Sequence, residues 1–346
     1  METLWFCLVA FLIAGYVILD GFDIGAGILH LFVARTNEQR RQVLESIGPF
    51  WDGNEVWLVA AGGTIYLAFP VLYAASFSGF YLPLIIVLWL LMLRGLAIEL
   101  RNHVSSPVWA PFWDVVFAGS SVLLAVFYGV TLGNVIRGVP LNAEGEFFLP
   151  LWTTFRVSGD VGILDWYTIL AGVLAVAALA MHGALWVAYK TSGPVEARAR
   201  TAALASSSAV ILLTGLVTFF TFRVQALVLF SFSSRPWIYL FALLPLAALA
   251  GVWLSMRKVG AALAPFLWSC LYLAAMLSSA AAGIYPYVLP AVSGPARSLT
   301  IFNASAGKPG LATGLVWWIP GMALACAYVW FLYRRFAGKV SVRAET

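Results

Sequence analysis

Three features of the sequence predict an all-α protein that crosses a membrane many times: its composition, its long apolar stretches and the placement of its basic residues. Of the 346 residues, 62% are hydrophobic and 10% are charged, and the mean hydropathy is +0.92. Soluble domains carry about 25% charged residues, so a water-soluble globule could not bury this much apolar surface. In lipid, each backbone polar group must be satisfied within its own segment, which favours helices.

About nine apolar stretches are long enough to cross a bilayer, which takes about 20 helical residues. We place them at 4–32, 49–74, 77–101, 111–137, 160–189, 203–226, 236–256, 262–287 and 311–334. Pro70 and the S-F-S-G run at 76–79 predict a turn between the second and third spans. With the N-terminus outside and the C-terminus inside, most of the 20 Lys and Arg residues lie on the inner side, as the positive-inside rule requires.

The first span carries a polar stripe. On one helix face, at spacings of three or four residues, lie Tyr16, Asp20, Asp23, Gly27 and His30. Gly21, Gly25 and Gly27 let a neighbouring backbone approach closely, so the stripe should face protein rather than lipid. A charge at the bilayer centre costs about 2.5 kcal/mol or more. The stripe therefore indicates a proton relay or a cation site, with a hydrogen-bonded polar seam between helices as the alternative.

The second span opens with two carboxylates. Asp52 and Glu55 are three residues apart and share a helix face, which favours a bound proton on one of them. Trp51 and Trp57 flank them and mark the depth of the membrane interface. Because the preceding loop is on the inner side, the two acids would lie at the cytoplasmic mouth of a proton path. The alternative is that they compensate the dipole at a helix start.

The third and fourth spans add Arg94, Glu99 and Asp114. Arg94 and Glu99 are five residues apart and are poor partners for each other, so each should pair with another helix. Arg94 could balance Asp23 or Asp114, and the alternative is that it extends to the inner interface. Asp114 also lies at a helix start, where dipole compensation is the simpler interpretation.

The histidines and cysteines do not predict a haem or metal site. His30 and His182 lie in different spans and His103 lies in a loop, so no pair has the spacing of axial haem ligands. We interpret them as hydrogen-bonded structural residues. The three cysteines stand singly in apolar runs without metal-binding spacing. The N-terminus lacks the pattern of a cleavable signal peptide, so we expect the first helix to be retained.

Several motifs resemble subunit II of the cytochrome bd ubiquinol oxidases. They are D-G-F-D-I-G-A-G at 20–27, E-Q-R-R at 38–41, I-G-P-F-W-D-G-N-E-V-W-L at 47–58, A-G-G at 61–63, F-S-G-F-Y at 77–81, R-G-x-A-I-E-x-R at 94–101 and the W-D to G-S segment at 113–121. Y-P-Y-V-L-P at 285–290 and S-L-T-I-F-N-A-S at 298–305 also match the cyanide-insensitive branch. The resemblance covers nearly the whole chain, although 140–280 matches in hydropathy more than in residues.

The resemblance implies a fold and a location. It implies two four-helix bundles plus one peripheral helix, in a bacterial cytoplasmic membrane. We accordingly expect an N-terminal bundle with the acidic motifs at 1–137, an outer loop and the peripheral helix at 138–202, and a C-terminal bundle with a cytoplasmic tail at 203–346. The family's enzyme oxidises quinol and reduces dioxygen to water.

For this chain, the resemblance implies a haem-free subunit without catalytic residues of its own. It would assemble with a subunit I that carries haem b and haem d, or b-type haems, and would supply part of the proton path. The expected proton path comprises Asp52, Glu55 and Glu99. The expected buried charge network or cation site comprises Asp20, Asp23, Arg94 and Asp114. The expected interface motif comprises Trp51, Asn54 and Trp57. A structural quinone and a small single-span accessory subunit are further expected associates.

A stand-alone proton or ion transporter is the alternative from another class. It would function as an isolated chain, and such transporters usually have broken helices in paired repeats. We find no such pair in the sequence.

Overall fold

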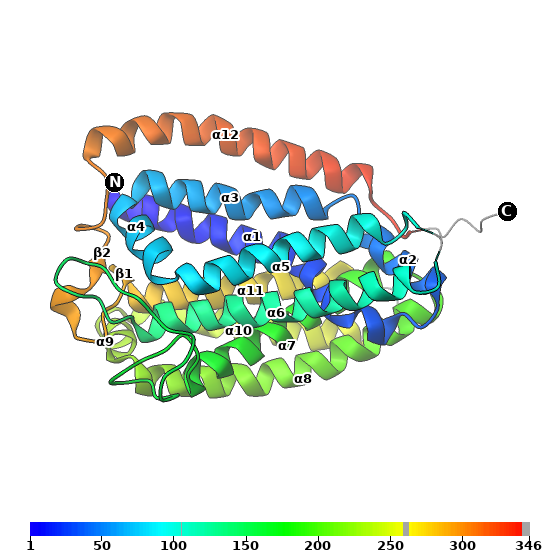
Figure 1. The fold of residues 1–346 in the computed structure, drawn as a ribbon, viewed down its shortest axis with the longest axis horizontal. Coiled ribbons are helices and arrows are strands. Elements are labelled where there is room, and N and C mark those ends of the chain that lie inside the picture. Colours follow the sequence, from blue (N-terminus) through cyan, green and yellow to red (C-terminus); the bar gives the residue numbers. More distant parts are fainter. Residues whose placement is uncertain (105, 259–262, 341–346) are drawn as a thin grey trace.

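Long helices that run along one axis dominate the structure (Figure 1). The computed structural model describes residues 1–104, 106–258 and 263–340. Its helices are α1 (Glu2–Val33), α2 (Asn37–Ile47), α3 (Trp51–Ala68), α4 (Pro70–Gly79), α5 (Tyr81–Leu100), α6 (Trp109–Arg137), α7 (Trp166–Lys190), α8 (Gly193–Val224), α9 (Ala226–Ser234), α10 (Tyr239–Met256), α11 (Leu263–Ile284) and α12 (Lys308–Arg335). Two short antiparallel strands, β1 (Tyr287–Leu289) and β2 (Leu299–Thr300), lie before α12.

The prediction of an all-α membrane protein is confirmed. Within the described residues, eight helices are long and apolar enough to cross a membrane: α1, α5, α6, α7, α8, α10 with the turn before it, α11 and α12. They correspond to eight of the nine predicted spans. The remaining prediction, 49–74, covers α3 and the first half of α4. The first residue of the predicted span 262–287 and the end of the tail, 341–346, lie outside the described residues.

The connection between the second and third predicted spans differs in detail from the prediction. The chain breaks at Phe69, where the backbone leaves the helical region, and Pro70 begins α4. A proline is favourable at a helix start because it has no N–H to donate. The S-F-S-G run at 76–79 is helical rather than a turn, and the break between α4 and α5 falls at Phe80 instead.

The helices form two groups of four with one peripheral helix. Contacts join α1, α3, α5 and α6 in one group and α7, α8, α10 and α11 in the other, and α1 and α6 pack against α7. The peripheral helix is α12, which lies along α3 at the edge of the molecule (Figure 1). Only 6% of its spanning segment is buried, against 61% for α7. The prediction placed the peripheral helix within 138–202, but the helix of that segment is α7. Hydropathy does not distinguish the two, because lipid is as apolar as a packed interior.

Glycines bring α1 into backbone contact with its neighbours. A Cβ on Gly25 would lie 2.0 Å from the carbonyl oxygen of Leu179 on α7, and one on Gly27 would lie 2.0 Å from Oγ of Ser121 on α6. The predicted role of these glycines in close helix packing is confirmed. As a result, the polar stripe of α1 is buried in the protein, as predicted.

Gly25→Ala is expected to lower the stability of the protein strongly. Overpacking typically costs about 1–3 kcal/mol, and here the added methyl group would meet backbone atoms that cannot rotate away. Thermal unfolding in detergent measures the loss. Gly62→Ala is the matched control, because a Cβ at Gly62 meets no atom within 4 Å. Equal unfolding temperatures for the two variants would contradict the close contact.

The two ends of the bundle differ. At the first, which we call the α2 end, lie α2, the C-terminal ends of α5, α7 and α10, and the end of the described chain; at the other lie the strands and the loop between α6 and α7 (Figure 1). At the strand end, the Asp165 side chain accepts hydrogen bonds from the backbone N–H groups of Tyr167 and Thr168. Arg137 pairs with the same carboxylate. This cap explains why α7 begins later than the predicted span 160–189.

Candidate functional site

A buried charge cluster joins α1, α3 and α5. Nη2 of Arg94 lies 2.7 Å from Oδ1 of Asp20 and 3.3 Å from Oε2 of Glu55. The side chains of Arg94 and Asp20 are fully buried, whereas that of Glu55 is 26% exposed. The guanidinium therefore bridges carboxylates from two helices. The sequence proposed Asp23 or Asp114 as the partner of Arg94, and the structure places Asp20 and Glu55 there instead.

Asp23 lies next to this cluster, one helical turn along α1. The Asn54 side chain donates hydrogen bonds to Oδ2 of Asp23 at 2.8 Å and to the carbonyl oxygen of Leu19 at 2.9 Å. Within the described residues, Oδ1 of Asp23 and the Nε and Nη1 atoms of Arg94 have no hydrogen-bond partner. Each such buried atom costs about 1–3 kcal/mol. A proton bound to Asp23 or a further polar partner would remove part of this cost.

Two tyrosines border the cluster on the side toward the strand end. The hydroxyl groups of Tyr16 and Tyr128 lie 2.7 Å apart, and Tyr16 precedes Asp20 by one turn of α1. The sequence analysis placed Tyr16 on the polar stripe but did not include Tyr128. A tyrosine in an apolar span resembles any interfacial aromatic residue, so only its contact across the α1–α6 boundary reveals the pair.

Asp114 belongs to a second cluster at the α2 end. Nε2 of His30 lies 2.7 Å from its Oδ1, Nε of Arg101 donates to the same oxygen at 2.6 Å, and Nη1 of Arg40 donates to Oδ2 at 3.0 Å. One buried carboxylate thus faces two guanidinium groups and an imidazole. Sequence reasoning did not find the roles of Arg40 and Arg101, because it treated them as loop charges.

Asp52 and Glu99 lie on the surface of the chain near the α2 end. Asp52 is exposed in the first turn of α3, three residues before Glu55. Glu99 is exposed in the last turn of α5, and its backbone carbonyl lies 2.8 Å from Nδ1 of His103. Because Asp52 and Glu55 share a helix face, Asp52 is the surface neighbour of the buried cluster.

The two tryptophans beside these acids fill grooves between helices. A Cβ on Gly15 of α1 would lie 2.8 Å from the ring of Trp57, and one on Gly95 of α5 would lie 3.5 Å from the ring of Trp51. The sequence interpreted both residues as markers of membrane depth. Their contacts hold α3 against α1 and α5, the helices that carry Asp20 and Arg94.

His182 is fully buried and hydrogen-bonded on both ring nitrogens. Nδ1 lies 2.7 Å from Oγ of Ser269, Nε2 lies 2.9 Å from the carbonyl oxygen of Ile18, and the ring stacks on Phe266. His30 is bonded to Asp114, so both histidines of the spans make the internal hydrogen bonds that were predicted. In the part of the chain that the structure describes, no three His, Cys, Asp or Glu side chains are grouped to hold a metal ion.

Together, these features define a multi-span helical membrane protein with buried clusters of acidic and basic side chains. Charges inside a membrane span are costly and usually mark an ion or proton pathway. The two functions considered from the sequence, a transporter that acts by itself and a subunit of a larger membrane enzyme, both belong to this class.

Comparison with known proteins distinguishes between these two functions. The family model described as "Cytochrome bd terminal oxidase subunit II" matches residues 1–336, and the chain belongs to this family. It is therefore a subunit of a quinol oxidase, which it forms with a subunit I, and it is not a stand-alone transporter.

Individual relatives are similar to this chain over nearly the full length of both proteins. The chain is 31% identical to the "Probable cytochrome oxidase subunit 2" of Haemophilus influenzae, over 98% of this chain and 95% of that protein. It is 30% identical to the "Cytochrome bd-I ubiquinol oxidase subunit 2" of Escherichia coli K12, over 99% and 95% of the two chains. The fold matches a chain of the bd oxidase from Geobacillus thermodenitrificans with a TM-score of 0.76 and 18% identity, over 97% and 98% of the two chains.

Proposed function

We propose that this chain is the haem-free subunit of its oxidase and supplies part of the proton path to the oxygen-reducing site in subunit I. The observation that carries the proposal is the cluster of Asp20, Asp23, Glu55 and Arg94, which is buried at one side and reaches the surface of α3 at the other. Reduction of dioxygen to water consumes protons, so the oxidase needs such a path through its membrane part.

The charges of the cluster favour a mobile proton. The guanidinium of Arg94 contacts two carboxylates, those of Asp20 and Glu55, and a third, that of Asp23, lies one turn further along α1 and accepts from Asn54. An unbalanced charge is strongly disfavoured in a buried site, so at least one carboxyl group must bind a proton or the cluster must bind a cation. Asp23 is the best candidate, because Asp20 and Glu55 are paired with Arg94, whereas Oδ1 of Asp23 has no hydrogen-bond partner among the described residues.

The order of the acids gives the path a direction. Asp52 is exposed at the α2 end, Glu55 is partly exposed one turn further along α3, and Asp20 and Asp23 lie behind it on α1. We propose that protons pass in that order. Glu99 would be a second entry on α5 or would contribute negative charge that attracts protons to the same surface.

Subunit I would cover the exposed face of α3 and α5. Large apolar side chains on this face are widely exposed in the isolated chain, with Val59 at 73% and Trp89 at 61%. Asp52 and Glu55 lie on the same helix as Val59. Assembly there would place the proton path at the boundary between the subunits, where it can continue into the partner.

A bound cation is the alternative to a bound proton, and the two buried clusters differ in whether they could accept a further positive charge. Asp114 already faces His30, Arg40 and Arg101, so a further positive charge would be repelled there. The cluster around Asp20 and Asp23 has an excess of carboxylates, and among the described residues Oδ1 of Asp23 has no hydrogen-bond partner, so it can take a proton. Its acids are not grouped as ligands of a metal ion in the described part of the chain. We therefore propose that the two clusters do not form one network: the first carries a proton, and the second fixes α2 against α6.

Two further parts of the proposal concern the haems and the orientation. Both nitrogens of His182 and one nitrogen of His30 are engaged in hydrogen bonds, which supports haems being held by the partner alone.

The α2 end carries Arg35, Arg40, Arg41 and Arg101, which supports a cytoplasmic location of this end. The N-terminus would then be outside a bacterial cytoplasmic membrane.

The test is the Asp52→Asn variant of the assembled oxidase. Oxygen consumption with quinol should fall several-fold while the haem spectrum and the ratio of the two subunits stay unchanged, because the amide cannot carry a proton. Asp160→Asn, which changes an exposed acid at the strand end, is the matched control and should retain full turnover. Unchanged turnover in Asp52→Asn would show that this carboxylate only stabilises the start of α3.

A further inference from the structure

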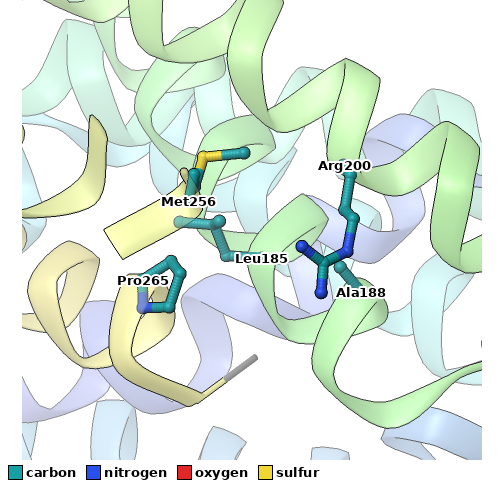
Figure 2. Close-up of a pocket in the computed structure, with 5 residues that line it drawn as sticks. All are labelled: Leu185, Ala188, Arg200, Met256 and Pro265. Carbon is teal, nitrogen blue, oxygen red and sulfur yellow. The ribbon is translucent and has the colours of Figure 1, made fainter. Parts of the chain in front are cut away.

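A small cavity of about 10 Å³, room for one water molecule, lies between the four helices of the second group, at the α2 end. Figure 2 shows its lining, which consists of Leu185 and Ala188 from α7, Arg200 from α8, Met256 from α10 and Pro265 from α11. Met256, Leu185 and Pro265 lie on one side, and the guanidinium group of Arg200 extends from α8 beside Ala188 (Figure 2). The Arg200 side chain is 34% exposed, so its charge is accessible from the surface.

Arg200 lies at the depth of the lipid headgroups. Beyond it, α8 contains only uncharged residues through the stretch 202–222, which Arg223 ends. A stretch of about 20 residues crosses the hydrocarbon core, so the two arginines mark the two membrane surfaces on one helix. Leu204, one turn further on the face of Arg200, is 40% exposed and would contact an acyl chain.

The surface around this cavity has an excess of positive charge. Between Asp165 and Glu345 the sequence contains a single acidic residue, Glu196. Oε1 of Glu196 accepts a hydrogen bond from Nε of Arg200 at 3.2 Å, and its Oε2 accepts one from Lys339 at 2.6 Å. Arg257 and Lys258 directly follow Met256 and are exposed. One carboxylate is thus shared between two cations, and more positive charge lies beside it.

We propose that the basic surface around Arg200, over this cavity, binds the headgroup phosphate of an anionic phospholipid. Clusters of Lys and Arg at the cytoplasmic ends of transmembrane helices attract such headgroups, and a guanidinium group suits the geometry of a phosphate. The phosphate would bind the terminal nitrogens of Arg200, and an acyl chain would follow the apolar surface at Leu204. The site lies in the second helix group and does not depend on the carboxylate cluster of α1, α3 and α5.

The experiment counts lipids bound to the intact oxidase. The complex is purified in mild detergent, incubated with equal amounts of phosphatidylglycerol and phosphatidylcholine, and analysed by native mass spectrometry. The wild-type complex should retain phosphatidylglycerol preferentially. Arg200→Gln should reduce its retention about fivefold, the factor that corresponds to about 1 kcal/mol for one basic residue at a membrane surface.

Three further variants make the result decisive. Arg200→Lys keeps the charge and should keep most of the lipid, whereas Arg223→Gln, at the other surface of the same helix, should retain it fully. Glu196→Gln should retain more lipid than the wild type, because Arg200 no longer shares its charge with a carboxylate. Equal retention of phosphatidylglycerol by Arg200→Gln and wild type would overturn the proposal. Equal retention of the two lipids by the wild type would also overturn it.

Discussion

Arg94→Gln is expected to prevent stable assembly of the oxidase. The substitution leaves Asp20 and Glu55 without their shared cation inside the helix bundle. Removal of one partner from a buried ion pair costs about 3–5 kcal/mol, because the other charge stays buried and unpaired. The amount of assembled complex in the membrane and its unfolding temperature in detergent measure the effect. Arg156→Gln, in the exposed loop between α6 and α7, is the matched control and should behave as wild type.

A double variant separates loss of charge balance from loss of packing. Asp20→Asn combined with Arg94→Gln removes one positive and one negative charge and leaves polar side chains of similar size. It should recover a large part of the lost stability, because the fully buried carboxylate of Asp20 is then no longer left without its cation. If the double variant were less stable than Arg94→Gln alone, the side chain of Arg94 would act mainly through its shape. If Arg94→Gln assembled normally, the ion pair with Asp20 would have no structural importance.

Glu55→Gln is expected to slow turnover more than any other single change of an acid in the first cluster that leaves assembly intact. Glu55 is the contact between the exposed face of α3 and the buried pair of Asp20 and Arg94. A glutamine retains the shape and can still accept a hydrogen bond from Arg94, but it cannot transfer a proton. Loss of a positioned proton-transfer group typically costs 10²- to 10⁴-fold, and water can replace part of it, so we expect a decrease of about tenfold or more.

The measurement for Glu55→Gln is oxygen consumption with quinol, together with the rate of proton uptake after rapid mixing of the reduced enzyme with oxygen. Proton uptake should slow as much as oxygen consumption, while the haem spectrum stays unchanged. Glu45→Gln is the matched control, since Glu45 lies on α2 and pairs with Arg41 on the same helix. Normal proton uptake in Glu55→Gln would exclude this residue from the path and leave it a structural partner of Arg94.

The sequence alone determined the class of the protein and the faces of individual helices. Its hydropathy predicted an all-α membrane protein, and its motifs predicted the family. The spacing of Asp20, Asp23 and His30 placed them on one face of α1, and the glycines among them predicted close packing. These features follow from the period of one helix and from the cost of exposing polar groups to lipid, so they need no knowledge of other helices.

The tertiary structure decided how those faces meet. It paired Arg94 with Asp20 and Glu55 and assigned Asp114 to His30, Arg40 and Arg101. It also placed α7 at the centre and α12 at the edge, although both are similarly apolar. Helical periodicity gives the direction of a side chain around its own axis but not the rotation and shift of one helix against another. Lipid is as apolar as a protein interior, so composition does not distinguish a helix that faces lipid from one that faces protein.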